Sequence, residues 1–233
     1  MSQIEQTKEY SLLGGRIRQI THSPGDFTGA IGYHKNGSLH FRYPMADGKF
    51  HGLCRGWHAN GVLAIEETFF NGKLIGPRKS WYASGQIKHE AFYGNDGIEG
   101  AVKEWYESGQ LKSEFFYVKG RKEGSVTEWY EDGTLQFKGY YESNIFSGTM
   151  MAWYQSGHKK SLETYISGLL NGIYQEWHEN GRLKIRCIFR EHRLDGIRTE
   201  WYRNGKIHLE IPYVDGFYTA LEKNGMKPEG KKN

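Results

Sequence analysis

Residues 100–117 read GAVKEWYESGQLKSEFFY, and the same pattern returns every 24 residues along the chain. Every tryptophan falls at this spacing: Trp57, Trp81, Trp105, Trp129, Trp153, Trp177 and Trp201. A glycine stands four residues after each tryptophan. Counting 24 residues back from Trp57 reaches Tyr33, so the sequence contains eight repeat units. An internal period of about 20 to 50 residues is typical of repeat proteins, so the fold follows from one unit.

Each unit has the sequence chemistry of a β-hairpin. Five units carry Asn-Gly or Asp-Gly after the aromatic residue, and these dipeptides favour a two-residue type I′ turn because both positions need positive φ. Such a turn places the residue two before each tryptophan opposite the residue nine after it. The predicted cross-strand pairs are Arg55 with Glu66, Lys79 with Glu90, Lys103 with Glu114, and Met151 with Leu162.

The sequence therefore predicts an all-β fold, an elongated single antiparallel meander of about eight 24-residue hairpins. Alternation along the strands predicts a buried face with Phe115 and Tyr117, and a second face with Trp105, Lys112 and Glu114. There the tryptophan is expected to lie half covered by lysine stems. A glycine five residues before each tryptophan predicts a sharp bend where hairpins join.

The ends depart from the repeat pattern. Residues 1–28 are expected to form an N-terminal cap, residues 29–213 the repeat array, and residues 214–225 a truncated capping repeat. Residues 226–233 are expected to be a disordered tail.

Composition excludes several classes of protein. The chain has 31 glycines, 15% aromatic residues and only 5 prolines, which fits neither collagen nor a disordered chain, and it has no long apolar segment. The net charge is +4 and no secretory signal is visible, so a cytoplasmic location is expected. Cys54 and Cys187 fit neither a disulfide framework nor a metal cluster and are interpreted as packed thiols.

The residues give no pattern for an active site. His34, His58 and His178 share the position after the aromatic residue, but neighbouring units place them about 10 Å apart, too far to share a zinc ion. They are interpreted as replacements for tyrosine. Neither a nucleophilic triad nor a phosphate-binding loop is recognisable, so we expect no enzyme activity, no catalytic or metal residues, no cofactor and no small-molecule substrate.

A lysine column stands seven residues after the aromatic position, at Lys88, Lys112, Lys160 and Lys184. One interpretation is a solvated sheet face on which the lysines pair with Glu66, Glu90, Glu114 and Glu210. The other is a stripe of lysines and tryptophans that contacts anionic lipid or nucleic acid. The candidate partner-binding residues are Trp105, Trp129, Trp153, Lys112, Lys160 and Lys184.

Residues 104–114, EWYESGQLKSE, resemble the bacterial variant of the MORN repeat, and the resemblance extends from about residue 29 to 225. Proteins built only from this variant are commonly classed with the YwqK-type antitoxins, which are thought to bind and neutralise a toxin. The wider MORN group is associated with scaffolding and phospholipid contact. The resemblance implies a non-catalytic protein that binds and neutralises a protein partner, a toxin or effector enzyme, as an antitoxin or immunity protein does. The alternative is a scaffold that contacts anionic lipid or nucleic acid.

Overall fold

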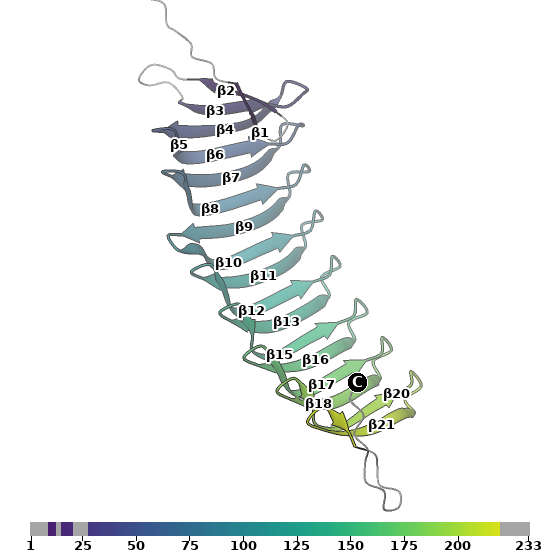
Figure 1. Cartoon of the computed structure of the whole chain (residues 1–233). Helices are drawn as coiled ribbons and strands as arrows, with labels where there is room; N and C mark the ends of the chain where they lie inside the picture. Colours follow the sequence, from purple (N-terminus) through teal and green to yellow (C-terminus); the bar gives the residue numbers. More distant parts are fainter. Residues whose placement is uncertain (1–8, 13–14, 21–27, 220–233) are drawn as a thin grey trace, which may run out of the picture. The chain divides into compact units, whose positions relative to one another are not determined.

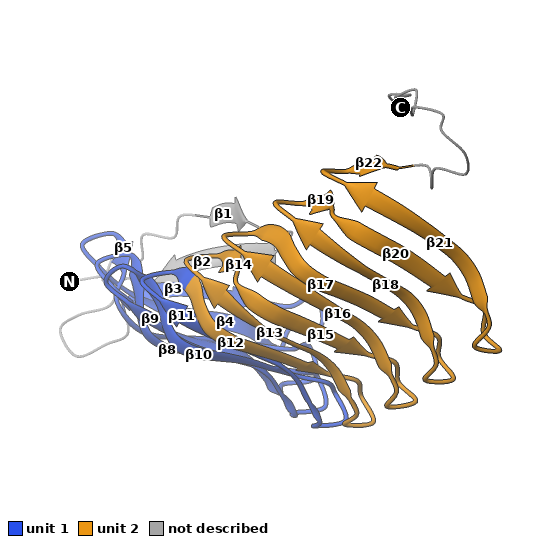
Figure 2. Ribbon diagram, turned by 90° about the horizontal axis from the view of Figure 1, so that it is seen from below, with its two compact units in different colours: residues 1–121 blue, residues 122–233 orange. Residues whose placement is uncertain are grey.

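The computed structural model describes residues 9–12, 15–20 and 28–219, which contain 22 β-strands and no helix. These described residues therefore include no helix that could cross a membrane. The chain divides into two compact units, residues 1–121 and 122–233, shown in different colours in Figure 2. Each unit is described by itself.

Unit 1 is an antiparallel meander in which consecutive long strands pair (Figure 1). Its strands are β1 (Glu9–Leu12), β2 (Gly15–Ile20), β3 (Gly29–Tyr33), β4 (Leu39–Ala46), β5 (Lys49–Phe50), β6 (Gly52–Trp57), β7 (Leu63–Phe70), β8 (Lys73–Trp81), β9 (Ile87–Gly94), β10 (Gly97–Trp105) and β11 (Leu111–Val118).

Unit 2 repeats the same arrangement, and its first strand begins at the last residue of unit 1. Its strands are β12 (Arg121–Trp129), β13 (Leu135–Glu142), β14 (Ile145–Phe146), β15 (Gly148–Trp153), β16 (Lys159–Ile166), β17 (Leu169–Trp177), β18 (Leu183–Arg190), β19 (Arg193–Leu194), β20 (Gly196–Trp201), β21 (Ile207–Val214) and β22 (Phe217–Tyr218).

The predicted all-β antiparallel meander of hairpin repeats is confirmed. Within the predicted cap, β1 pairs with β2 and β2 pairs with β3, while residues 1–8, 13–14 and 21–27 lie outside the described residues. Of the predicted truncated repeat, β22 pairs with β21, and residues 220–225 lie outside the described part. The predicted disordered tail, residues 226–233, also lies outside it.

The hairpin turn differs from the predicted type I′ turn. Between β10 and β11 the Gly109 amide donates to the Tyr106 carbonyl and the Tyr106 amide donates to the Gln110 carbonyl, each over 2.9 Å. Gly109 has a φ of +88°, whereas Ser108 is not among the positive-φ residues. The loop is therefore three residues long, a type I turn followed by one left-handed glycine. The seven other turns that follow the aromatic position have the same bonds, so the type I′ prediction for this turn is wrong.

Asparagine occupies the turn for a different reason. The Asn60 Oδ1 accepts the Val62 amide over 3.1 Å, and its Nδ2 donates to the Ala83 carbonyl of the next repeat over 2.8 Å. Asn36 and Asn180 make equivalent pairs of bonds. One amide side chain thus closes its own turn and joins it to the neighbouring hairpin.

Two-residue turns with positive φ at both positions occur at the opposite ends of the strands. Asn71 and Gly72 have φ values of 51° and 80°, which defines a type I′ turn between β7 and β8. Equivalent turns are Asp47-Gly48, Lys119-Gly120, Ser143-Asn144, Ser167-Gly168, Glu191-His192 and Asp215-Gly216.

The predicted register is confirmed, with a β-bulge that the sequence did not predict. Lys103 lies opposite Glu114, but Trp105 lies opposite Leu111, so Lys112 has no residue opposite it. The three-residue loop alone would shift the pairing by one residue, and the extra residue at the bulge restores it. Every described hairpin with this turn has such a bulge residue: His40, Ala64, Lys88, Lys112, Gln136, Lys160, Lys184 and His208.

The best buried side chains of each unit lie on one side of its sheet, called the inner side here. Val102 in unit 1 and Val126 in unit 2, each three residues before a tryptophan, are 8% and 1% exposed. Both free cysteines are also buried on this side, Cys54 in unit 1 and Cys187 in unit 2. Burial raises the pKa of each thiol to about 11. The interpretation of the cysteines as packed thiols is confirmed.

The predicted bend before each tryptophan is also present. Gly76 and Gly100 have φ values of +86° and +79°, and the pairing of β10 with β9 is interrupted between Glu99 and Lys103. Because positive φ strains any residue with a Cβ, glycine recurs at this position before all seven tryptophans.

Candidate functional site

Within each unit, one column of polar side chains joins each hairpin to the next. In unit 1 the Tyr82 hydroxyl donates to the Trp105 carbonyl over 2.7 Å. In unit 2 the Tyr154 hydroxyl donates to the Trp177 carbonyl over 2.9 Å, and the His178 Nε2 makes the same bond to the Trp201 carbonyl over 2.9 Å.

Histidine and tyrosine are therefore interchangeable donors in this column. His34 and His58 bind the carbonyls of Trp57 and Trp81, each over 2.8 Å, so the interpretation of these histidines as tyrosine replacements is confirmed. The residues that the structure describes contain no group of three or more metal-binding side chains.

The lysine column lies on the inner side because its residues occupy the bulge. Lys112 approaches Glu104, the residue before Trp105, to 4.0 Å and lies 5.8 Å from the Tyr106 ring centre. The Lys184 Nζ lies 2.6 Å from Glu176, and this hydrogen bond is the main reason that the pKa of Lys184 is raised.

The predicted pairing of these lysines with cross-strand glutamates is wrong. Three of those glutamates lie on the other, outer side of the sheet, where they pair with the cations opposite them. The distances are 2.8 Å for Arg55–Glu66, 2.7 Å for Lys79–Glu90 and 3.2 Å for Lys103–Glu114. The fourth, Glu210, accepts a hydrogen bond from the Thr199 hydroxyl over 3.3 Å.

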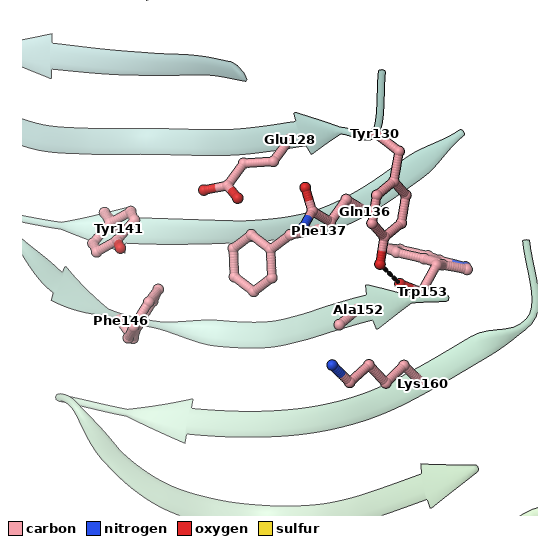
Figure 3. Close-up of a pocket in the computed structure, with 9 residues that line it drawn as sticks. All are labelled: Glu128, Tyr130, Gln136, Phe137, Tyr141, Phe146, Ala152, Trp153 and Lys160. Atoms are coloured by element: carbon pink, nitrogen blue, oxygen red, sulfur yellow. Dashed lines mark hydrogen bonds between the residues drawn. The ribbon is translucent and has the colours of Figure 1, made fainter. Parts of the chain in front are cut away.

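An open pocket of about 280 Å³ lies on the inner side of unit 2 (Figure 3). Its walls include Phe137, Tyr141 and Phe146, and the rings of Tyr141 and Phe146 stack with their centres 4.4 Å apart. Glu128 and Lys160 supply one charge of each sign. The remaining lining residues are Tyr130, Gln136, Ala152 and Trp153.

Of the six predicted partner-binding residues, the structure brings Trp153 and Lys160 together in this pocket. Trp105 and Lys112 belong to unit 1, and Trp129 and Lys184 belong to unit 2. All seven tryptophans are half-buried, as expected. Sequence reasoning missed the pocket. The sequence feature that could have indicated it is the departure from the repeat pattern at Gln136, where several repeats have lysine, and at Ala152, where several repeats have glutamate.

The outer side of unit 2 carries exposed apolar rows that sequence reasoning also missed. Ile173 and Ile188 lie directly opposite each other and are 43% and 45% exposed. They stand four residues before and eleven after Trp177, positions at which alternation puts a side chain on the outer side. Other exposed apolar residues in unit 2 include Tyr140, Ile145, Ile166, Leu169, Ile197, Ile207 and Val214.

Unit 1 contains a buried polar cluster on its inner side. Glu67, only 9% exposed, accepts from Arg78 Nε over 3.2 Å and from the Tyr43 hydroxyl over 3.4 Å. Burial and the neighbouring carboxylate raise the pKa of Tyr43 to about 12. Because the carboxylate is paired, the cluster is a structural ion pair and has no free nucleophile.

These features define a β-hairpin repeat protein in which the hairpins of each unit are joined through main-chain carbonyls of tryptophan. The family model of the MORN repeat variant matches residues 50–71, 72–95, 98–119, 122–143, 170–191 and 194–215, together more than half of the chain. The chain belongs to the MORN repeat variant family. The hairpin of β15 and β16 lies outside the six matched segments but has the same register and bulge.

Other comparisons add little. A search of curated proteins found no match. One solved structure that resembles part of the chain is described as "Crystal structure of GtfA/B complex bound to UDP and GlcNAc". It is 15% identical, the match covers 54% of this chain and 26% of that one, and the TM-score is 0.24, so it carries no argument about function.

Proposed function

We propose that this is a non-catalytic, cytoplasmic binding protein that neutralises a protein partner, a toxin or effector enzyme, through the outer side of its sheet. The observation that supports this is the pair Ile173 and Ile188, large apolar side chains that face each other across two strands and remain exposed. Contiguous exposed apolar residues on a folded surface are typical of protein interaction sites.

The rigidity of the surface favours tight recognition. Within unit 2, each hairpin is hydrogen-bonded to the next through its tyrosine or histidine and through main-chain pairing. A preformed surface loses little conformational entropy on binding, so more of the burial energy appears as affinity.

The alternative, contact with anionic lipid or nucleic acid, has less support. Lys112 and Lys184 already have carboxylate partners, and the net charge of +4 is small. Phosphate binding by several cations would weaken steeply with salt, whereas an apolar interface would not. Liposome flotation and oligonucleotide titration at low and high salt would reveal such binding.

The experiment that tests the proposal is co-purification from the native host with neighbouring genes expressed, followed by identification of the bound protein and assay of its activity. We expect an identified enzyme that the wild-type chain inhibits. Ile188→Asp should lose the partner, and the matched inner-side variant Lys184→Gln should keep it. Recovery of the chain alone, or equal binding by both variants, would contradict the proposal.

A further inference from the structure

One hairpin of unit 2 contains an ion pair between an acidic and a basic residue. Each of the two hairpins before it has only one of these two charged residues. In the hairpin of β17 and β18, Glu176 precedes the tryptophan and pairs with the bulge residue Lys184 at 2.6 Å. In the hairpin of β12 and β13 the same two positions are Glu128 and Gln136, so the acid remains and the base is absent.

The hairpin of β15 and β16 has the reverse arrangement. Its bulge residue is Lys160, but Ala152 stands where the glutamate would be. Lys160 lies 5.8 Å from the ring centre of Tyr154. Within the described part of the chain, neither Glu128 nor Lys160 has a charged partner within 4.0 Å.

The two unpaired charges line the same aromatic pocket. Figure 3 shows the Glu128 carboxylate and the Lys160 ammonium on opposite sides of the Phe137 ring, both extending toward the side of the pocket where Tyr141 and Phe146 lie. The Tyr130 hydroxyl donates a hydrogen bond to the Trp153 carbonyl over 2.9 Å. Glu128 and Lys160 are the two charged residues of the pocket lining, and their charges have opposite signs.

We propose that this pocket binds a zwitterionic ligand with an apolar side chain, an α-amino acid or a short peptide with free termini. The ammonium group of the ligand pairs with Glu128, its carboxylate pairs with Lys160, and its side chain packs on Phe137, Tyr141 and Phe146. Charge-assisted hydrogen bonds orient such a ligand and the aromatic walls supply apolar contact. The volume of about 280 Å³ is large enough for a ligand of one or two residues.

This proposal is independent of the proposed function, because the pocket lies on the inner side of the sheet and the apolar rows lie on the outer side. The direct test is calorimetric titration of the full chain with L-phenylalanine and with the dipeptide L-phenylalanyl-L-alanine. Saturable binding of the amino acid indicates a free amino acid as ligand, and binding of the dipeptide alone indicates a peptide. If neither probe saturates, the proposal is overturned.

Capped probes test the need for both charges. N-acetyl-L-phenylalanine lacks the ammonium group and L-phenylalaninamide lacks the carboxylate. Each should bind about tenfold more weakly than L-phenylalanine, because one of Glu128 and Lys160 then stays unpaired in the complex; the equivalent terminal caps apply to the dipeptide. Equal binding of capped and free probes would overturn the proposal.

Variants that restore the internal ion pairs test the site itself. Ala152→Glu gives Lys160 a partner and Gln136→Lys gives Glu128 one, so each should weaken binding about tenfold while circular dichroism shows a folded chain. Ala152→Gln has the size of glutamate without its charge and should keep most of the affinity, and the matched control Lys184→Gln should keep all of it. Equal losses in Ala152→Gln and Ala152→Glu, or no loss in folded Ala152→Glu, would overturn the proposal.

Discussion

The Nε2 atom of His178 lies 2.9 Å from the main-chain oxygen of Trp201, 23 residues further along the chain. Because a carbonyl oxygen can only accept, Nε2 carries the hydrogen. The hydroxyl of Tyr154 reaches the carbonyl of Trp177 over the same sequence separation and distance. The position after each tryptophan therefore requires a donor at a fixed reach from the main chain, whichever ring carries it.

Substitution of His178 tests this requirement. His178→Phe leaves the half-buried carbonyl of Trp201 without its donor, so the free energy of unfolding should fall by about 1 to 3 kcal/mol. His178→Tyr places a hydroxyl at the same site and should lose less than His178→Phe. Urea unfolding followed by circular dichroism measures both. Equal losses in the two variants would show that the hydrogen bond contributes nothing.

Valine truncation distinguishes the two sides of the sheet. Val126 is 1% exposed on the inner side, and Val126→Ala should lower the free energy of unfolding by about 2 kcal/mol, since it removes two buried carbon groups worth roughly 0.8 kcal/mol each and leaves a cavity. Val214 is 58% exposed, and Val214→Ala should change stability by less than about 0.5 kcal/mol. Similar losses at the two positions would contradict the assignment of the core.

The type I′ turns of unit 2 offer opposite substitutions at equivalent positions. His192 has a φ of 67° where most other repeats have glycine, so His192→Gly should raise the free energy of unfolding by up to about 1 kcal/mol. Gly168 has a φ of 80°, and a Cβ there would lie 2.9 Å from Ile145 Cγ2. Gly168→Ala should therefore destabilise the chain. Thermal unfolding midpoints that do not move in opposite directions would contradict this account.

The buried thiols predict a loss of stability at alkaline pH. Burial raises the pKa of Cys54 and Cys187 to about 11, above the ordinary value of 9.0. The folded chain then retains protons that the unfolded chain releases, so the free energy of unfolding falls as pH rises from about 9 to about 11. The double variant Cys54→Ala with Cys187→Ala should show a shallower decline in urea midpoint over this range. An unchanged decline would refute the contribution of the thiols.

The sequence predicted the pairing of Lys103 with Glu114 through a turn that the chain does not adopt. A two-residue loop and a three-residue loop followed by a bulge give the same register. The bulge could not be predicted from the sequence because its residues share no chemistry: His40, Ala64 and Gln136 occupy it as readily as lysine does. The 24-residue period shows which residue types recur. It does not show on which side of the sheet the side chain of a bulge residue lies, because that depends on the backbone conformation at the bulge.

The candidate site was predicted only in part for the same reason. Lys160 was singled out by its column, and the structure adds Glu128 and the aromatic wall of Phe137 and Phe146, which belong to different repeats. A repeat consensus hides such a site, because the pocket arises where the consensus fails at Gln136 and Ala152.

Within unit 2, the bonds from tyrosine or histidine to the next tryptophan carbonyl also determine how the chain can change in length. Removal of residues 154–177 would join Trp153 to His178, which would then occupy the place of Tyr154 and still reach the carbonyl of Trp201. Tyr130 would keep its own acceptor at Trp153. A deletion that is not a multiple of 24 residues would separate donors from acceptors, and one of odd length would also turn apolar side chains to the wrong side. Unequal recombination in whole multiples of the period is therefore the genetic change that such a gene tolerates.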